Sequence, residues 1–191
     1  MTSGTLVRAA RKSRGFTQKQ LAHRTGIDQA RVSRAESGSE DLRSGTVDRL
    51  LAGAGHRLYA APTRRDDAAA IAPQIRSSLE AGDRSLALRY LIQLNDNLLS
   101  EKGIIRGVLA VAEPELAGRK VWDAAIAGLV AWRLNEERVP LPAWVNDPRR
   151  ILDRTRVLRV DPADPEPTRA DVPRELLEHG VLAWEDTFAS V

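Results

Sequence analysis

The segment from residue 18 to residue 36 constrains the fold of this chain more than any other part. It contains two helix-length stretches separated by Gly26, which tolerates the positive φ that a tight turn needs. Two helices that cross closely also need a small side chain at the crossing, and Ala22 is placed to supply it. Apolar residues are spaced to anchor the second helix to a core, namely Leu21, Ile27 and Val32. The segment therefore predicts two short helices joined by a tight turn.

The flanking segments predict further short elements around this pair. The Thr17 hydroxyl and the Asp28 carboxylate are each placed to cap the amino end of a helix. Weak alternation of polar and apolar residues before Pro62 favours a short strand after the helices. The expected elements are helices over about residues 6–15, 18–25, 29–36 and 44–53, and a strand over residues 56–61. Together they predict a helix-turn-helix domain over residues 1–61.

Four short motifs in this domain carry a family resemblance. They are Phe16-Thr17-Gln18-Lys19-Gln20-Leu21-Ala22, Gly26-Ile27, Val32-Ser33-Arg34 and Glu36-Ser37-Gly38. At these positions the chain resembles the phage-repressor-type helix-turn-helix family, also called the Xre family, over about residues 4–60. The resemblance implies a four- to five-helix repressor-like domain that binds double-stranded operator DNA and regulates transcription.

The resemblance also implies a role for individual side chains. Residues 29–35 would form the recognition helix in the major groove, where Gln pairs with adenine and Arg with guanine. The implied DNA-binding residues are Gln18, Lys19, Gln29, Ala30, Arg31, Ser33, Arg34, Ser37 and Arg43. Arg11 and Glu36 correspond to a pair that usually forms an internal ion pair in this family, so we assign both to structure.

A domain of this size usually reads DNA as a dimer, because two half-sites supply both affinity and specificity. We therefore expect a homodimer. Residues 56–59 could pair with the same residues of a second copy as a β-ribbon, or could simply be an irregular exit from the preceding helix.

The charge is divided unevenly along the chain. The net charge of +3 hides a basic amino-terminal part, because residues 1–65 carry 13 Lys and Arg against 5 Asp and Glu, a balance of +8. The rest carries 16 basic and 21 acidic residues, a balance of −5. A basic amino-terminal part followed by an acidic remainder indicates that the first part binds a polyanion and the second part has a different role.

Composition excludes several classes of chemistry. Cysteine is absent and the chain has only three His residues, which argues against thiolate or histidine metal sites and against a Cys nucleophile. There is no Gly-rich phosphate loop and no apolar run long enough to span a membrane. We therefore expect a cytoplasmic, nucleoid-associated protein that is not an enzyme, with no catalytic residues, no metal and no cofactor.

Beyond a linker over residues 62–68, residues 69–191 predict a second, helical domain with minor β structure. Several amphipathic helices are expected up to about residue 135, with Pro73 in the first turn of the first of them and Asp83 capping the second. Trp144 and Trp184 lie in irregular segments and are candidates for a partner surface. An acidic cluster at Asp161, Asp164, Glu166 and Asp171 is interleaved with prolines and is interpreted as a solvated loop.

Two stretches of this second domain carry a looser resemblance. Residues 134–145, with their Pro-x-Pro-Ala-Trp segment, and residues 173–181 resemble bacterial antitoxins that accompany nucleotidyltransferase-like toxins. The resemblance implies an antitoxin of a type II toxin–antitoxin system, whose second domain neutralises a cognate toxin while the first represses the operon. The alternative is a stand-alone regulator whose second domain binds a small ligand or oligomerises.

Overall fold

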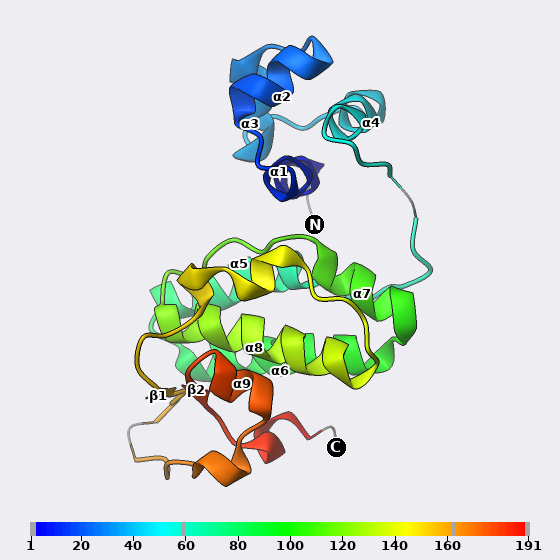
Figure 1. Cartoon of the computed structure of the whole chain (residues 1–191). Coiled ribbons are helices and arrows are strands. Elements are labelled where there is room, and N and C mark those ends of the chain that lie inside the picture. Colours follow the sequence, from blue (N-terminus) through cyan, green and yellow to red (C-terminus); the bar gives the residue numbers. More distant parts are fainter. Residues whose placement is uncertain (1–2, 59, 162, 190–191) are drawn as a thin grey trace. The chain divides into compact units, whose positions relative to one another are not determined.

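The computed structural model describes residues 3–58, 60–161 and 163–189, and these residues are mainly helical (Figure 1). The predicted fold class, mainly α with minor β structure, is confirmed. The chain forms two compact units, residues 1–62 (unit 1) and residues 63–191 (unit 2). No helix among the described residues is long and apolar enough to cross a membrane.

The described residues of unit 1 form four short helices around an apolar core. They are α1 (Ser3–Ser13), α2 (Gln18–Thr25), α3 (Gln29–Glu36) and α4 (Ser44–Gly53). Val7, Leu21, Val32 and Leu50 come from different helices and are fully buried together. The first helix also comes very close to the third, because a Cβ added at Gly4 would lie 1.9 Å from the carbonyl oxygen of Ala35.

The prediction of a strand over residues 56–61 is wrong, because the residues described in this segment form no strand. His56–Leu58 have no strand structure, and Tyr59 lies outside the described residues. The His56 backbone N–H donates to the carbonyl of Leu51 at 2.8 Å, which closes the end of α4 instead of forming a ladder. Leu58 is exposed, so the described residues of this segment have no buried face that would hold a strand in place.

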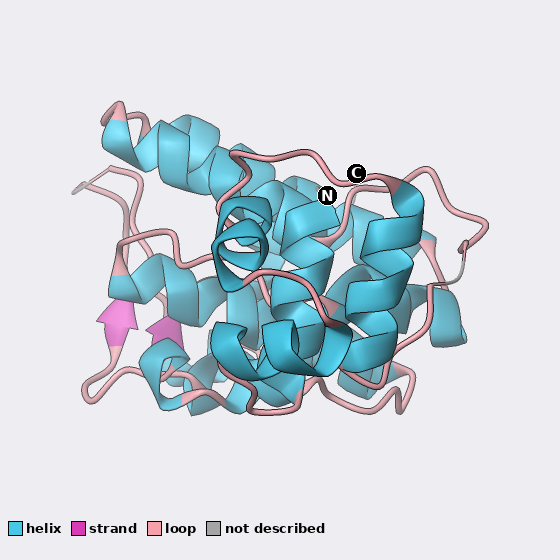
Figure 2. Ribbon diagram, turned by 90° about the horizontal axis from the view of Figure 1, so that it is seen from above, coloured by secondary structure: helices cyan, strands magenta, loops and turns pink. Residues whose placement is uncertain are grey.

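Unit 2 is a helical bundle with one short strand pair (Figure 2). Its α-helices are α5 (Ala68–Glu80), α6 (Arg84–Ser100), α7 (Gly103–Val111), α8 (Lys120–Glu136) and α9 (Arg174–Glu178). Short 3₁₀ helices cover Ala143–Asn146, Pro148–Arg150, Arg169–Asp171 and Glu185–Phe188. Strands β1 (Arg156–Val157) and β2 (Val181–Leu182) pair in parallel, with Arg156 opposite Val181.

The central element of unit 2 is α8, whose residues from Trp122 to Ala131 are all buried. It packs against α6 and α9, and a Cβ added at Gly128 would lie 2.8 Å from the Leu176 side chain of α9. Such a helix is apolar on all sides because neighbouring elements cover every face. Trp122 belongs to this core.

Pro73 does not lie in the first turn of its helix, contrary to our expectation. It stands inside α5, where its ring nitrogen cannot donate the usual hydrogen bond. The Pro73 side chain is exposed, while Ile71, Ile75 and Leu79 on the same helix are buried. Burial of that apolar face offsets a helix-interior proline penalty of about 3 kcal/mol.

Trp144 is not part of an exposed partner surface, so that interpretation is wrong. Its side chain is buried, and its indole N–H donates to the Ala110 carbonyl at 2.8 Å. The fully buried Arg150 guanidinium lies 5.0 Å from the centre of its ring. A buried tryptophan needs a partner for its one donor, and this carbonyl satisfies it. Trp184 is half-buried.

The acidic residues between 161 and 171 form hydrogen-bonded turns. Asp161, Asp164 and Glu166 are exposed, and the Asp164 carboxylate accepts a hydrogen bond from the Asp161 backbone N–H. Among the described residues, no group of three or more His, Asp or Glu side chains is arranged to hold a metal ion.

Candidate nucleic-acid interface

Helix α2 begins at a complete capping box. The Gln20 backbone N–H donates to the Thr17 hydroxyl oxygen at 3.1 Å, and the Thr17 backbone N–H donates to Gln20 Oε1 at 2.8 Å. Two of the helix's unpaired N–H groups are thereby satisfied by local sequence alone. The cap also fixes the position of Gln18 and Lys19 in the first turn, where both were predicted to meet DNA.

The turn between α2 and α3 has the geometry that the sequence predicts. Gly26 has φ 65°, in the left-handed region, and its N–H donates to the carbonyl of Ala22. Asp28 then accepts a hydrogen bond from the Arg31 backbone N–H at 3.3 Å and caps α3. The recognition helix thus starts at a defined position relative to α2.

Helix α3 has one face in the core and one face in solvent. Val32 and Ala35 are buried, as the motif predicts. The residues predicted to bind DNA are all exposed or half-buried, namely Gln18, Lys19, Gln29, Ala30, Arg31, Ser33, Arg34, Ser37 and Arg43. Their contact with DNA stays a prediction. The Ser37 hydroxyl donates to the Arg34 carbonyl at 2.9 Å, so in this structure it closes the helix end.

A buried ion pair ties α1 to α3, as the resemblance implied. Arg11 Nε donates to Glu36 Oε1 at 2.7 Å, and Arg11 Nη2 donates to Glu36 Oε2 at 2.8 Å. Only 12% of the Arg11 side chain and 4% of the Glu36 side chain are exposed. Gln18 Nε2 also donates to Glu36 Oε2 at 2.9 Å, which joins α2 to the same carboxylate. The Glu36 carboxylate therefore joins three helices: a bidentate, charge-assisted contact links it to α1, and the Gln18 hydrogen bond links it to α2.

Glu40, which the sequence analysis did not single out, holds both arginines of the recognition helix. Arg31 Nε donates to Glu40 Oε1 at 2.7 Å, and Arg34 Nε donates to Glu40 Oε2 at 3.1 Å. The hydrogen bond from Arg31 lowers the pKa of Glu40 below its ordinary value, which favours the charged form of the pair. This contact arises because the chain turns back after α3. No local sequence signal predicts that change of direction.

The comparison with known protein families matches this part of the molecule. Residues 7–53 match a family described as helix-turn-helix. The matched segment runs from within α1 to the end of α4. Neither a curated protein nor a solved structure matches the chain. The matched family consists of DNA-binding regulator domains and is generally non-enzymatic.

The geometry and the family match define a helix-turn-helix DNA-binding domain of the Xre-like type in residues 7–53. The protein is a DNA-binding transcription regulator.

We expect a Glu40→Gln variant to bind scrambled DNA roughly threefold to tenfold more tightly than the wild type. The change removes a negative charge that competes with phosphate for Arg31 and Arg34. It also releases both guanidinium groups from a fixed position, so the preference for the specific site over scrambled DNA should fall. Fluorescence anisotropy with the two DNAs measures both effects.

The matched control is Asp41→Asn, which removes the same charge from an exposed neighbour. The control should change the affinity less than Glu40→Gln and leave the sequence preference intact. Equal effects of the two substitutions would show that Glu40 acts only through the overall charge.

Proposed function

We propose that the protein is a transcriptional repressor that binds its own operator as a homodimer through α3. The observation that carries this proposal is the solvent-facing surface of α3, where Gln29 is exposed and Arg31 and Arg34 would exchange Glu40 for DNA, while Val32 fixes the helix to the core. The basic balance of residues 1–65 supplies attraction to phosphate that does not depend on sequence. Two copies would supply the two half-sites that a module of this size requires.

A nuclease footprint on the promoter of the protein's own gene tests this proposal. We expect protection of two half-sites related by symmetry, with centres about one helical turn of DNA or a multiple of it apart. Sedimentation of the free protein gives its oligomeric state in the same conditions. A single unrepeated half-site bound by a monomer would contradict the homodimer.

We further propose that unit 2 binds a protein partner, a cognate nucleotidyltransferase-like toxin, and that the chain is its antitoxin. Both stretches that carry this resemblance belong to unit 2, and their Trp144, Val145, Leu176 and Val181 side chains are buried. These buried side chains maintain the domain, whereas other residues of the two stretches, among them Asn135, Arg138 and Arg174, are exposed. The acidic balance of residues beyond 65 favours a basic partner.

An exposed apolar stripe on α7 supports a protein partner for unit 2. Ile104, Val108 and Val111 lie on one face of this helix, with exposed fractions of 80%, 37% and 61%. Their spacing is that of anchors on one side of a helix. Apolar side chains gathered in this way on a surface mark an interaction site more often than scattered ones do.

We expect an Ile104→Glu/Val111→Glu variant to lose the partner while it still binds the operator. The two carboxylates would have to be buried without partners in the interface, which should weaken the complex at least about a hundredfold. Co-expression with the product of the adjacent gene, followed by affinity capture, measures the loss. The control is Ile151→Glu, an exposed apolar residue of unit 2 outside α7. Retention of the partner by the α7 variant would contradict the assignment, and so would a second copy of this chain bound in its place.

A further inference from the structure

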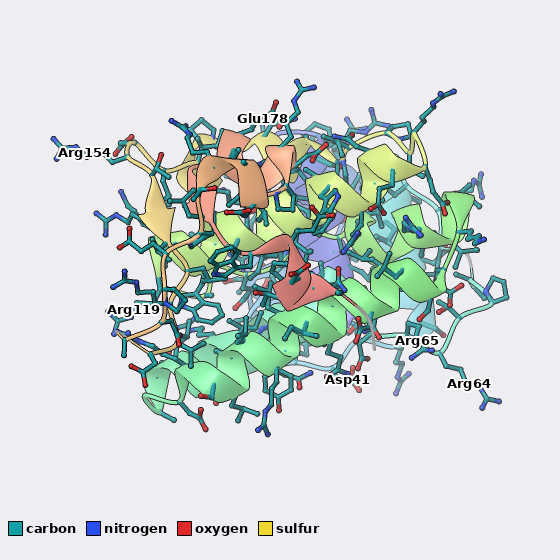
Figure 3. All side chains as sticks on the ribbon, turned by 90° about the horizontal axis from the view of Figure 1, so that it is seen from below. Asp41, Arg64, Arg65, Arg119, Arg154 and Glu178 are labelled. Atoms are coloured by element: carbon teal, nitrogen blue, oxygen red, sulfur yellow. The ribbon has the colours of Figure 1, made fainter. Side chains whose placement is uncertain are left out.

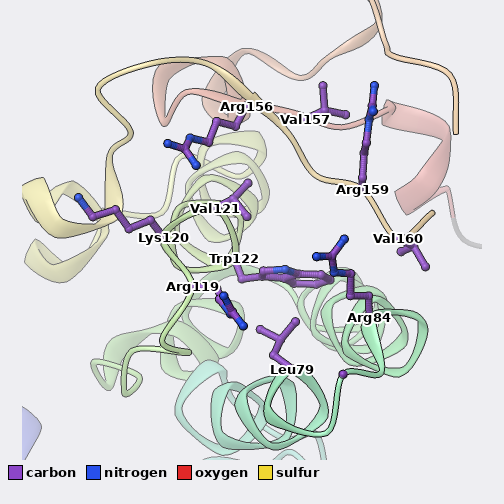
Figure 4. Close-up of a pocket in the computed structure, with 11 residues that line it drawn as sticks. Leu79, Arg84, Arg119, Lys120, Val121, Trp122, Arg156, Val157, Arg159 and Val160 are labelled. Atoms are coloured by element: carbon purple, nitrogen blue, oxygen red, sulfur yellow. The ribbon is translucent and has the colours of Figure 1, made fainter. Parts of the chain in front are cut away.

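A basic cavity lies in unit 2, on the side where α8 begins. It has a volume of about 750 Å³, within the range of small-molecule sites. Its cationic lining residues come from three separate parts of the chain, the start of α6, the start of α8 and the β1 segment. They are Arg84, Arg119, Lys120, Arg156 and Arg159. Figure 4 shows these side chains grouped around the buried Trp122.

The charge in this cavity is largely uncompensated. Among the described lining residues there is no Asp or Glu. Arg159 pairs with Glu166, but Arg84, Arg119 and Arg156 have no ion-pair partner in the part of the chain that the structure describes. This gathering of positive charge stands out because residues beyond 65 have an acidic balance. Like charges held together repel one another, and an anion would relieve that repulsion.

The start of α8 adds to the attraction for an anion. Arg119 stands at the amino end of this helix, and its side chain makes no capping hydrogen bond. Residues 119–122 at the start of α8 all line the cavity, so the positive end of the helix dipole lies beside the cationic side chains. Asp83, by contrast, accepts a hydrogen bond from the Leu86 backbone N–H and caps α6.

The remaining wall of the cavity is apolar. Leu79, Val121, Val157, Val160 and Trp122 supply it, from α5, α8 and the β1 segment. A simple inorganic anion would leave this wall without a partner. A ligand with several phosphate charges and a flat apolar body fits both halves of the lining.

We propose that this cavity is a ligand site that takes a nucleotide-like organic polyphosphate. The arginines would hold the phosphate chain, since guanidinium groups bind phosphate oxygens in a bidentate manner. The apolar wall would cover the ring system. The site lies wholly within unit 2, so it does not depend on the repressor and antitoxin proposals above.

The test uses the full chain, with ATP and inorganic triphosphate as probes in equilibrium dialysis at about physiological ionic strength. We expect ATP to bind with a dissociation constant of about 1–100 μM and inorganic triphosphate to bind at least about tenfold more weakly. An Arg119→Gln/Arg156→Gln variant should lose at least about tenfold in ATP affinity. Both side chains are exposed at their positions, so the fold should tolerate the change.

The matched control is Arg64→Gln/Arg65→Gln, which removes the same charge from two exposed residues outside the cavity (Figure 3). The control should bind ATP like the wild type. Hydrogen exchange of the wild type gives an independent measurement, because bound ATP should slow exchange at residues 119–122.

Several results would overturn the proposal. Absence of binding to both probes would remove the site, and equal loss in both double variants would show only general charge attraction. Equal affinity for ATP and inorganic triphosphate would show that the apolar wall does not contribute to binding. Binding of an RNA oligonucleotide without binding of ATP would assign the patch to a nucleic acid instead.

Discussion

A Glu36→Ala variant is expected to have a unit 1 that is less stable than the wild type by about 3 kcal/mol. The substitution removes the only carboxylate that the Arg11 guanidinium contacts in the described part of unit 1, and it removes an acceptor of Gln18. Arg11 is largely buried and would lose most of its compensation, which is why the cost exceeds that of a surface ion pair. Amide hydrogen exchange of α1, α2 and α3 in the full chain measures the change locally.

The double variant Arg11→Met/Glu36→Leu provides the control for this first prediction. It removes both charges and keeps comparable side-chain volume, so it should recover most of the stability lost in Glu36→Ala. Recovery identifies the unpaired Arg11 charge as the cause. A double variant as unstable as Glu36→Ala would contradict that cause, and an unchanged exchange rate in Glu36→Ala would contradict the role of the ion pair.

The second large effect is expected at Arg34, on the exposed face of α3. An Arg34→Ala variant should lose about 1–3 kcal/mol of binding free energy on the protein's own promoter, which is roughly fivefold to 150-fold in affinity. Loss of a base-reading arginine should also reduce the preference for the promoter over scrambled DNA. Anisotropy titrations of both DNAs give the two quantities.

Arg49→Ala is the control for Arg34→Ala, because Arg49 is an exposed arginine of α4 outside the predicted DNA-binding set. It removes the same charge and should weaken both DNAs slightly and equally. If Arg34→Ala binds both promoter and scrambled DNA with the affinity of the wild type, the assignment of α3 as the recognition helix is contradicted.

Local sequence signals predicted unit 1 well because its elements are short and capped. Thr17, Gly26 and Asp28 each determine a helix end through a neighbour within a few positions, and the structure has these contacts. The pair Arg11–Glu36 joins distant helices, so only the family resemblance led to it. Glu40 was missed because its contacts with α3 depend on the path of the chain after that helix.

Unit 2 was less predictable because its important contacts are long-range. Trp144 was misjudged since the carbonyl that receives its hydrogen bond comes from the end of α7. The strands at Arg156 and Val181 could be suspected from apolar runs, but not their parallel pairing. The basic cavity collects arginines from three segments, and each of them looks like an ordinary surface charge when taken alone.

The contact of Glu40 with Arg31 and Arg34 also bears on how DNA binding responds to salt. Counterions are released from the DNA phosphates that a protein neutralises, and the Glu40 carboxylate that either arginine leaves would bind a cation in return, which offsets part of that release. Wherever Arg31 or Arg34 also touches a phosphate, the logarithm of the binding constant should therefore fall less steeply with the logarithm of the salt concentration than the slope of about 0.9 for each phosphate neutralised by an unpaired cation. A regulator built like this keeps more of its operator occupancy when the ionic strength around it rises.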